Sequence, residues 1–294
     1  MAAWVLGIIG GSGLYDLEGL EDRRWVEIAG PFGAPSDALL TGRLGGVELW
    51  FLPRHGRGHV LPPTAVNARA NIDALKRAGC TDVLSLSAVG SLREALAPGH
   101  FVVVDQYIDR TFGREKSFFG PGLVAHVSMA DPVCPRLSAL AAAAGRAAGA
   151  RVVEGGCYLA MEGPQFSTKA ESALYRSWRC DVIGMTGMPE AKLAREAELP
   201  YASVAMVTDY DCWHEVIAHV DVAQIQQVLG ANAQRARDLV RQLVLDLPAE
   251  RSASPIDTCR DGALITDPAG MDPAMVARLS AVAGRALESR AIPA

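Results

Sequence analysis

The sequence of 294 residues has no excess of basic residues, no apolar run of membrane-spanning length and no cysteine pattern typical of a metal site. Its formal net charge is −5 and its Lys and Arg residues do not cluster, which argues against a protein built mainly to hold nucleic acid. A membrane-spanning helix needs about 20 consecutive apolar residues, so no span is expected. The apolar N-terminus has no basic leader and is interpreted as a first strand, not a signal peptide.

The 6 cysteines include no CxxC pair, and none lies at metal-ligand spacing from a histidine; they are Cys80, Cys134, Cys157, Cys180, Cys212 and Cys259. The sequence therefore predicts free thiols in a cytoplasmic protein without a metal site, and nothing in it indicates a structural disulfide. It has no internal repeat and no dinucleotide-binding fingerprint. If Gly11 and Gly13 began a GxGxxG motif, its third glycine would fall on Asp16.

What the sequence does contain is a regular alternation of strand-like and helix-like segments. Apolar runs of strand length occur at residues 4–9, 47–53, 82–86, 101–105, 157–161, 182–185 and 202–207. Segments with helical spacing lie between them or after them, at 63–78, 135–148, 168–178, 189–198 and 222–247. This alternation favours an α/β fold: a single domain with a mixed, largely parallel central β-sheet flanked by helices.

The domain is expected to span residues 1–247. Residues 248–272 are rich in Ser, Pro, Asp and Gly and are predicted to form an exposed linker, followed by a last helix over 273–289. We expect the whole segment 248–294 to pack on the same domain or on a neighbouring subunit.

Several predicted strands end in loops whose residues suit an anion. Gly10–Gly13 follows the first strand and allows close approach of the backbone to an anion, although a plain tight turn uses the same residues. The strand at 47–53 runs into Arg54–His59, where a guanidinium offers a planar fork for phosphate oxygens; a solvated surface loop is the alternative. Small and hydroxyl residues end two further strands, at Ser87–Ser91 and at Thr186. Taken together, these strand ends carry residue types that suit the binding of inorganic phosphate.

Two carboxylates follow the apolar run 202–207. Asp209 and Asp211 are two residues apart, so they point to the same side if the extended conformation continues. Holding two desolvated carboxylates together is costly, and the usual relief is that one of them keeps its proton. The pair suits a basic or amide-like heterocycle, and Phe166 beside Ser167 is a candidate aromatic face. A solvated turn or a helix N-cap is the alternative interpretation of the aspartates.

Six motifs occur in the order found in the trimeric purine nucleoside phosphorylases: Gly10–Leu14, Arg54–Gly56, Ser87–Arg93, Glu162–Ser167, Met185–Glu190 and Thr208–Trp213. Over about residues 5–247 the sequence resembles this family, most closely the branch that acts on 5′-methylthioadenosine. The resemblance implies reversible phosphorolysis of S-methyl-5′-thioadenosine to adenine and S-methyl-5-thio-α-D-ribose 1-phosphate. It also implies a cytoplasmic homotrimer that binds a nucleoside and phosphate as co-substrate, uses no cofactor, and binds neither nucleic acid nor membranes.

Carried over residue by residue, the resemblance implies a site of three parts. Phosphate would be held by Ser12, Arg54, His55, Ser87, Ala88 and Thr186. The base would be held by Ser167, Asp209 and Asp211, of which the aspartates are catalytic, with Phe166 and Met185 at the sugar. His126 would reach a neighbouring subunit's pocket. The helical spacing of Val222 and Ile225 predicts an apolar wall at the 5′ end of the sugar.

Two alternatives remain open at this stage. The aspartates favour a 6-aminopurine, yet residues 184–191 look more like a bacterial methylthioinosine phosphorylase, so a 6-oxopurine nucleoside phosphorylase is the nearest rival. A non-catalytic nucleotide-binding protein is the second rival, although it has no need of the cationic loop at 54–59. Residues 251–294 match nothing closely.

Overall fold

The structure, a computed structural model, describes residues 3–11, 13–214 and 222–289. The strands are β1 (Val5–Gly10), β2 (Glu21–Val26), β3 (Leu39–Leu44), β4 (Val47–Pro53), β5 (Asp82–Ser91), β6 (His100–Val104), β7 (Gln106–Asp109), β8 (Arg151–Glu154), β9 (Cys157–Ala160), β10 (Val182–Gly184) and β11 (Tyr201–Asp209). The helices are α1 (Ala68–Arg77), α2 (Pro135–Ala147), α3 (Lys169–Ser177), α4 (Gly187–Glu196), α5 (Val222–Leu245), α6 (Pro273–Arg278) and α7 (Ser280–Glu288). No helix in this part of the chain is both long and apolar enough to cross a membrane.

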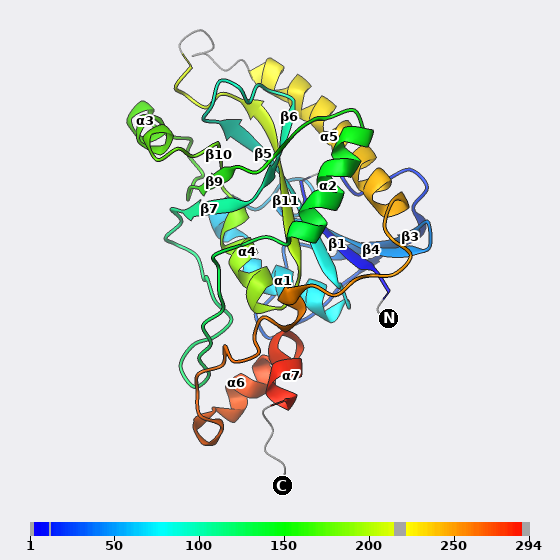
Figure 1. The fold of residues 1–294 in the computed structure, drawn as a ribbon, viewed down its shortest axis with the longest axis vertical. Coiled ribbons are helices and arrows are strands. Elements are labelled where there is room, and N and C mark those ends of the chain that lie inside the picture. The colour runs from blue at the N-terminus through cyan, green and yellow to red at the C-terminus, as the bar shows by residue number, and fades with distance from the viewer. Residues whose placement is uncertain (1–2, 12, 215–221, 290–294) are drawn as a thin grey trace.

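The strands form one mixed sheet in which β5 is the branch point (Figure 1). Along its first half β5 pairs in parallel with both β1 and β11, and its last residues pair antiparallel with β10. The sheet continues through β4, β3 and β2 on one side and through β9 and β7 on another, while β6 and β8 extend it beyond β11. The predicted single α/β domain with a mixed, largely parallel sheet is confirmed.

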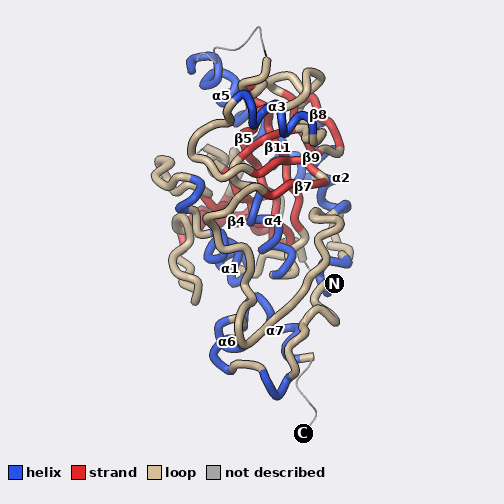
Figure 2. The backbone as a smooth tube through the Cα atoms, turned by 90° about the vertical axis from the view of Figure 1, so that its left-hand side faces the viewer, coloured by secondary structure: helices blue, strands red, loops and turns tan. Residues whose placement is uncertain are grey.

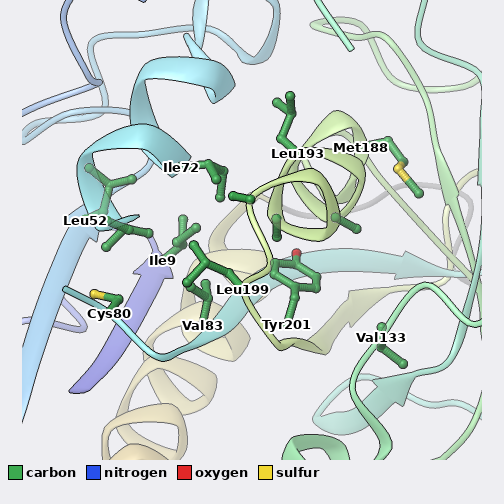
Figure 3. Close-up of a cluster of buried hydrophobic side chains, with 14 of the residues drawn as sticks. Ile9, Leu52, Ile72, Cys80, Val83, Val133, Met188, Leu193, Leu199 and Tyr201 are labelled. Carbon is green, nitrogen blue, oxygen red and sulfur yellow. The ribbon is translucent and has the colours of Figure 1, made fainter. Parts of the chain in front are cut away.

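Helices cover both faces of the sheet because side chains of a strand alternate between its faces. Ile9 of β1 joins the core under α1 and α4, whereas Leu6 and Ile8 join the core under α2 and α5. Figure 3 shows the first of these cores, with Ile9, Val83 and Tyr201 between the strands and α4. These buried cores hold the strand ends, and therefore the loops that follow them, in fixed positions.

The segment 248–272 is largely exposed, as its composition predicted, but part of it packs on the domain. Ser254, Ile256 and Arg260 are only 6%, 6% and 1% exposed. Arg260 pairs with Glu198 at 2.6 Å. Ser254 caps a short 3-10 turn, so turn-forming residues here terminate packed turns instead of marking solvated chain. Composition did not predict the buried residues, because it reports turn propensity and not burial.

The predicted last helix, 273–289, is two short helices, α6 and α7, separated at Leu279. α7 packs against α1 of the same chain, below the body of the domain in Figures 1 and 2. The long loop between β7 and α2 descends to this end. His126 N donates to Ala263 O at 2.9 Å, and Asp272 N donates to Gly122 O at 2.9 Å.

Candidate active site

Strand register brings the predicted phosphate residues to one edge of the sheet. Arg54 N donates to Gly10 O at 2.9 Å, so the cationic loop starts beside the glycine loop. Ser87 and Ala88 lie on the neighbouring strand β5. β10 runs antiparallel to β5, with Ile183 opposite Gly90, and its continuation therefore carries Thr186 back toward Ser87.

Arg54 is buried, and its guanidinium is largely engaged by the protein itself. Nε and Nη2 donate to the two carboxylate oxygens of Glu190 at 2.9 and 3.1 Å. Nη2 also donates to Ser85 Oγ at 2.7 Å, and Nη1 to Leu86 O at 2.9 Å. The two-pronged contact to phosphate expected from the sequence is thus made to Glu190 instead. One N–H of Nη1 is left, because a guanidinium carries five.

Glu190 is a site residue that the sequence reasoning missed. Its Oε1 also accepts from Ser85 Oγ at 2.6 Å and from Tyr201 OH at 2.7 Å. Figure 3 shows Tyr201 beneath α4 with its hydroxyl directed at the helix. Burial is the largest single effect on the pKa of Arg54 and lowers it, but Glu190 and the neighbouring tyrosines together raise it, so the guanidinium stays charged. One clue was present: a buried arginine requires a carboxylate, and Glu190 closes one of the six motifs.

His55 is half-buried and is held away from a cationic role. Its Nδ1 lies 2.9 Å from Leu61 O, and because a carbonyl only accepts, this nitrogen carries the proton. The ring stacks on His59 with centroids 4.3 Å apart. Burial, reinforced by the charge of Arg54, lowers the pKa of His55 to about 4. The imidazole is therefore neutral near pH 7, with Nε2 as an acceptor.

The remaining phosphate candidates are small neutral groups. Ser87 is buried, and its hydroxyl has no hydrogen-bond partner among the described residues. Ala88 is exposed. Thr186 precedes α4, but its side chain does not cap the helix. Thr186, Arg54 and Glu190 line the same small cavity. Ser12 lies outside the described residues.

Asp209 and Asp211 meet over Gly90, although not in the way the sequence predicted. Asp209 is the last residue of β11, and the extended conformation stops there, because Asp211 has φ +52°. A Cβ atom on Gly90 would lie 3.0 Å from Asp209 Oδ1 and 3.4 Å from Asp211 Cβ. Only glycine leaves room for both carboxylates at this point of β5.

The two carboxylates differ in their surroundings. Asp209 accepts from Thr208 Oγ1 at 2.7 Å and from Asp211 N at 2.8 Å. Burial raises the pKa of Asp211, and the charge of Asp209 adds to the effect. No Lys or Arg of the described residues forms a salt bridge with either aspartate. The pair is therefore able to retain one proton.

Loop 162–168 closes the same end of the site. Cys212 Sγ donates to Ser167 O at 3.3 Å, which places Ser167 next to the aspartates. Met185 packs on Gly163, where a Cβ would come within 2.5 Å of its sulfur. Phe166 is 82% exposed, so its ring makes little contact with the rest of this chain.

Arg114 ties these loops together and was also missed. It is buried, pairs with Glu162 at 3.2 Å and donates to the carbonyl oxygens of Glu162 and Met188 at 2.6 and 2.9 Å. It donates to Met185 O as well. Arg114 therefore joins the loop after β7 to both loops that carry the sugar candidates. Its only sequence signal was an arginine in a long irregular loop.

His126 is not brought to this cluster by the fold of this chain. His126 is exposed on the loop pinned to the C-terminal segment. α5 begins at Val222, but the side chains of Val222 and Ile225 lie outside the described residues. A larger cavity, of about 400 Å³, also lies elsewhere, between the loop around His126 and α4; it is lined by Lys116, Phe119, His126, Lys192 and Glu196, among others. In the ranges that the structure describes, three or more His, Cys, Asp or Glu side chains do not gather as metal ligands.

Comparison with known proteins agrees with this geometry. Residues 5–245 match the family model described as the Phosphorylase superfamily. A Cereibacter sphaeroides protein named S-methyl-5′-thioadenosine phosphorylase is 62% identical over 286 residues, covering 97% of this chain and 99% of the relative. A Rhodospirillum rubrum protein of the same name is 59% identical, covering 96% and 97%.

Solved structures show the same likeness. A methylthioadenosine phosphorylase from an antarctic soil metagenomic library superposes with a TM-score of 0.90 at 46% identity, covering 96% of this chain and 99% of that one. The Schistosoma mansoni methylthioadenosine phosphorylase in complex with adenine superposes with a TM-score of 0.75 at 38% identity, covering 82% and 91%.

Proposed function

This chain belongs to the phosphorylase superfamily, and we propose that it is a pentosyltransferase that catalyses the reversible phosphorolysis of S-methyl-5′-thioadenosine to adenine and S-methyl-5-thio-α-D-ribose 1-phosphate. The observation that carries the assignment is the aspartate pair over Gly90, at the same sheet edge as Arg54 and Ser87. An anion site and a carboxylate site at one sheet edge suit a phosphate and a purine.

The reaction breaks the C1′–N9 bond, whose electron pair leaves with the base, and forms a bond from a phosphate oxygen to C1′. Positive charge develops on the ribose and negative charge on the purine. Phosphate stabilises the first, and a proton donated by the aspartate pair toward N7 stabilises the second. The other carboxylate of the pair accepts from the exocyclic amine, which a 6-oxopurine lacks. Because the two carboxylates are coupled, the proton belongs to the pair and not to one residue.

Phosphate is proposed to bind to Ser12, Arg54, His55, Ser87, Ala88 and Thr186. The unpartnered Ser87 hydroxyl and the remaining Nη1 N–H of Arg54 are donors that suit its oxygens. His55 offers Nε2 as an acceptor for a protonated phosphate oxygen, because its Nδ1–H is donated to Leu61. We propose no cofactor beyond this co-substrate.

At the sugar we propose Phe166 and Met185, with Val222 and Ile225 forming the apolar wall at the 5′ end. A 5′-hydroxyl buried without a partner costs about 1–3 kcal/mol, whereas a methylthio group gains on leaving water. Methylthioadenosine should therefore exceed adenosine by about one to two orders of magnitude in kcat/KM, an effect of roughly 1.4–3 kcal/mol.

We propose that the enzyme works in the cytoplasm as a homotrimer, in which His126 enters the pocket of the next subunit. His126 lies at the α6–α7 end, whereas the chain after β11 leaves the opposite end in Figure 1. Phe166, which is 82% exposed, also suits a position at a subunit boundary. Cyclic symmetry lets each site borrow the same residue. Sedimentation showing a fully active monomer would refute this assembly.

The function is tested with a nucleoside panel, read for phosphate-dependent release of free base. Methylthioadenosine should release adenine fastest, methylthioinosine should react more slowly, and omission of phosphate should abolish release. Equal or faster release of hypoxanthine from methylthioinosine would favour the 6-oxopurine enzyme, for which residues 184–191 speak. Binding of methylthioadenosine without turnover would favour a non-catalytic protein.

A further inference from the structure

The cation at the centre of the phosphate site already has a counter-ion. The Arg54 and Glu190 side chains are 3% and 6% exposed, and their N–O distance is 2.9 Å. Glu190 accepts four hydrogen bonds, two from Arg54 and one each from Ser85 and Tyr201. These donors satisfy the carboxylate oxygens, and the ion pair sets the guanidinium and the carboxylate directly side by side. The buried pair therefore has no net charge.

The other basic groups at this edge are compensated in the same way. Arg57 pairs with Asp37 at 2.9 Å, and Arg114 pairs with Glu162 at 3.2 Å. His55 is neutral near pH 7, for the reasons given above. Among the described residues of the phosphate loops, no side chain offers an uncompensated positive charge. A site intended only to bind phosphate tightly would gain from such a charge.

We propose that Glu190 cancels the charge of Arg54 so that bound phosphate is held mainly by neutral donors and keeps its own negative charge for the ribosyl cation. This inference rests on the proposed function. Phosphate stabilises the developing positive charge on C1′ only to the extent that its electrons are not drawn to a protein cation on the other side. Glu190 is thus a positioning residue that acts through Arg54, and it trades phosphate affinity for transition-state stabilisation.

The test is Glu190→Gln, which removes the charge with almost no change in shape. We expect phosphate to bind about threefold to tenfold more tightly, while kcat at saturating phosphate falls about tenfold or more. The KM for methylthioadenosine should not change. Phosphate affinity is measured by calorimetry on the folded protein, without turnover.

Opposite results would overturn the inference. If Glu190 only holds Arg54 in position, Glu190→Gln weakens phosphate binding, and kcat/KM falls because the KM for phosphate rises. A matched control is Glu196→Gln, a buried carboxylate on the same helix that binds Ser117 and Phe118 instead of a cation. It should cost stability without moving phosphate affinity and kcat in opposite directions.

A measurement on the unaltered enzyme covers the case in which Glu190→Gln does not fold. A dianion bound at a site without net charge is little screened by salt, so phosphate affinity should change less than about twofold between about 20 and 300 mM added salt. A tenfold or larger loss would show an uncompensated cation at the site and would overturn the inference. Failure of the proposed function is separately visible, because the wild type would then release no adenine from methylthioadenosine.

Discussion

The two ends of the candidate site handle charge in opposite ways. At the phosphate end Arg54 is buried against Glu190, and the neighbouring Arg57 and Arg114 also have carboxylate partners. At the base end Asp209 and Asp211 lie together without a salt bridge among the described residues, and burial raises the pKa of Asp211. The charges at the phosphate end are paired and stabilise the fold, whereas burial at the base end disfavours the ionised form of Asp211.

The difference supports the proposal that acid–base chemistry takes place at the base end. A carboxyl group whose pKa is raised by burial and by a like charge is a candidate for proton exchange with a substrate. A paired cation does not exchange one, and its role is to fix positions. The predictions below change one end at a time.

The largest effect is expected at the base end. Asp209→Asn keeps the shape but presents an amide, which cannot transfer a proton. Turnover of methylthioadenosine should fall roughly 10²–10⁴-fold, and turnover of methylthioinosine should fall less, so the preference narrows or inverts. Steady-state kinetics on both nucleosides measure this. A parallel loss on both would mean that Asp209 does not read position 6 of the purine.

The next largest effect is a loss of stability at the phosphate end. Glu190→Ala leaves the Arg54 charge buried without a partner, which should lower the free energy of unfolding by about 3–5 kcal/mol. Urea denaturation measures it. Glu196→Ala is the control on the same helix, and it should cost less because Glu196 forms no salt bridge among the described residues. Equal losses of unfolding free energy in the two variants would show that burial of the glutamate, and not its ion pair, sets the cost of its removal.

A smaller effect of opposite sign is expected from Asp211→Asn. The raised pKa of Asp211 means that its contribution to stability is full below the unfolded pKa and is lost as pH rises through the folded pKa. An amide does not ionise, and Asn tolerates the positive φ. The variant should therefore gain up to about 1 kcal/mol near neutral pH, allowing for partial exposure, and nothing in acid. Thermal melts at neutral and acid pH measure the difference in stability. No gain at neutral pH would refute the prediction.

The smallest effect is expected at the rim. Arg93 pairs with Asp181 at 2.6 Å, but its side chain is 62% exposed. Arg93→Ala should cost less than about 1 kcal/mol of stability and should leave phosphate KM unchanged. A change in the KM for phosphate would instead show that Arg93 contributes to the phosphate site.

Local sequence patterns predicted most of the sheet but missed β2, β3, β7 and β8. β2 is largely exposed and has no apolar alternation, so nothing in its six residues marks it as a strand. The segment forms a strand because it pairs with β3. The predicted helix at 63–78 begins later, as α1, because Asn67 caps it by accepting from Ala70 N.

The sequence by itself determined which chemical groups stand at the strand ends. Parallel strands place their carboxyl ends at one edge, so the order of motifs along the chain was enough to group Arg54, Ser87 and Asp209. The tertiary structure alone decided the partners of the charges: Arg54 and Glu190 are 136 residues apart, and Arg251 and Asp82 are 169 apart. Periodicity reports the geometry of neighbours in the chain. Pairing across packed layers depends on how α4 and the C-terminal segment lie against the sheet, and no local pattern records that.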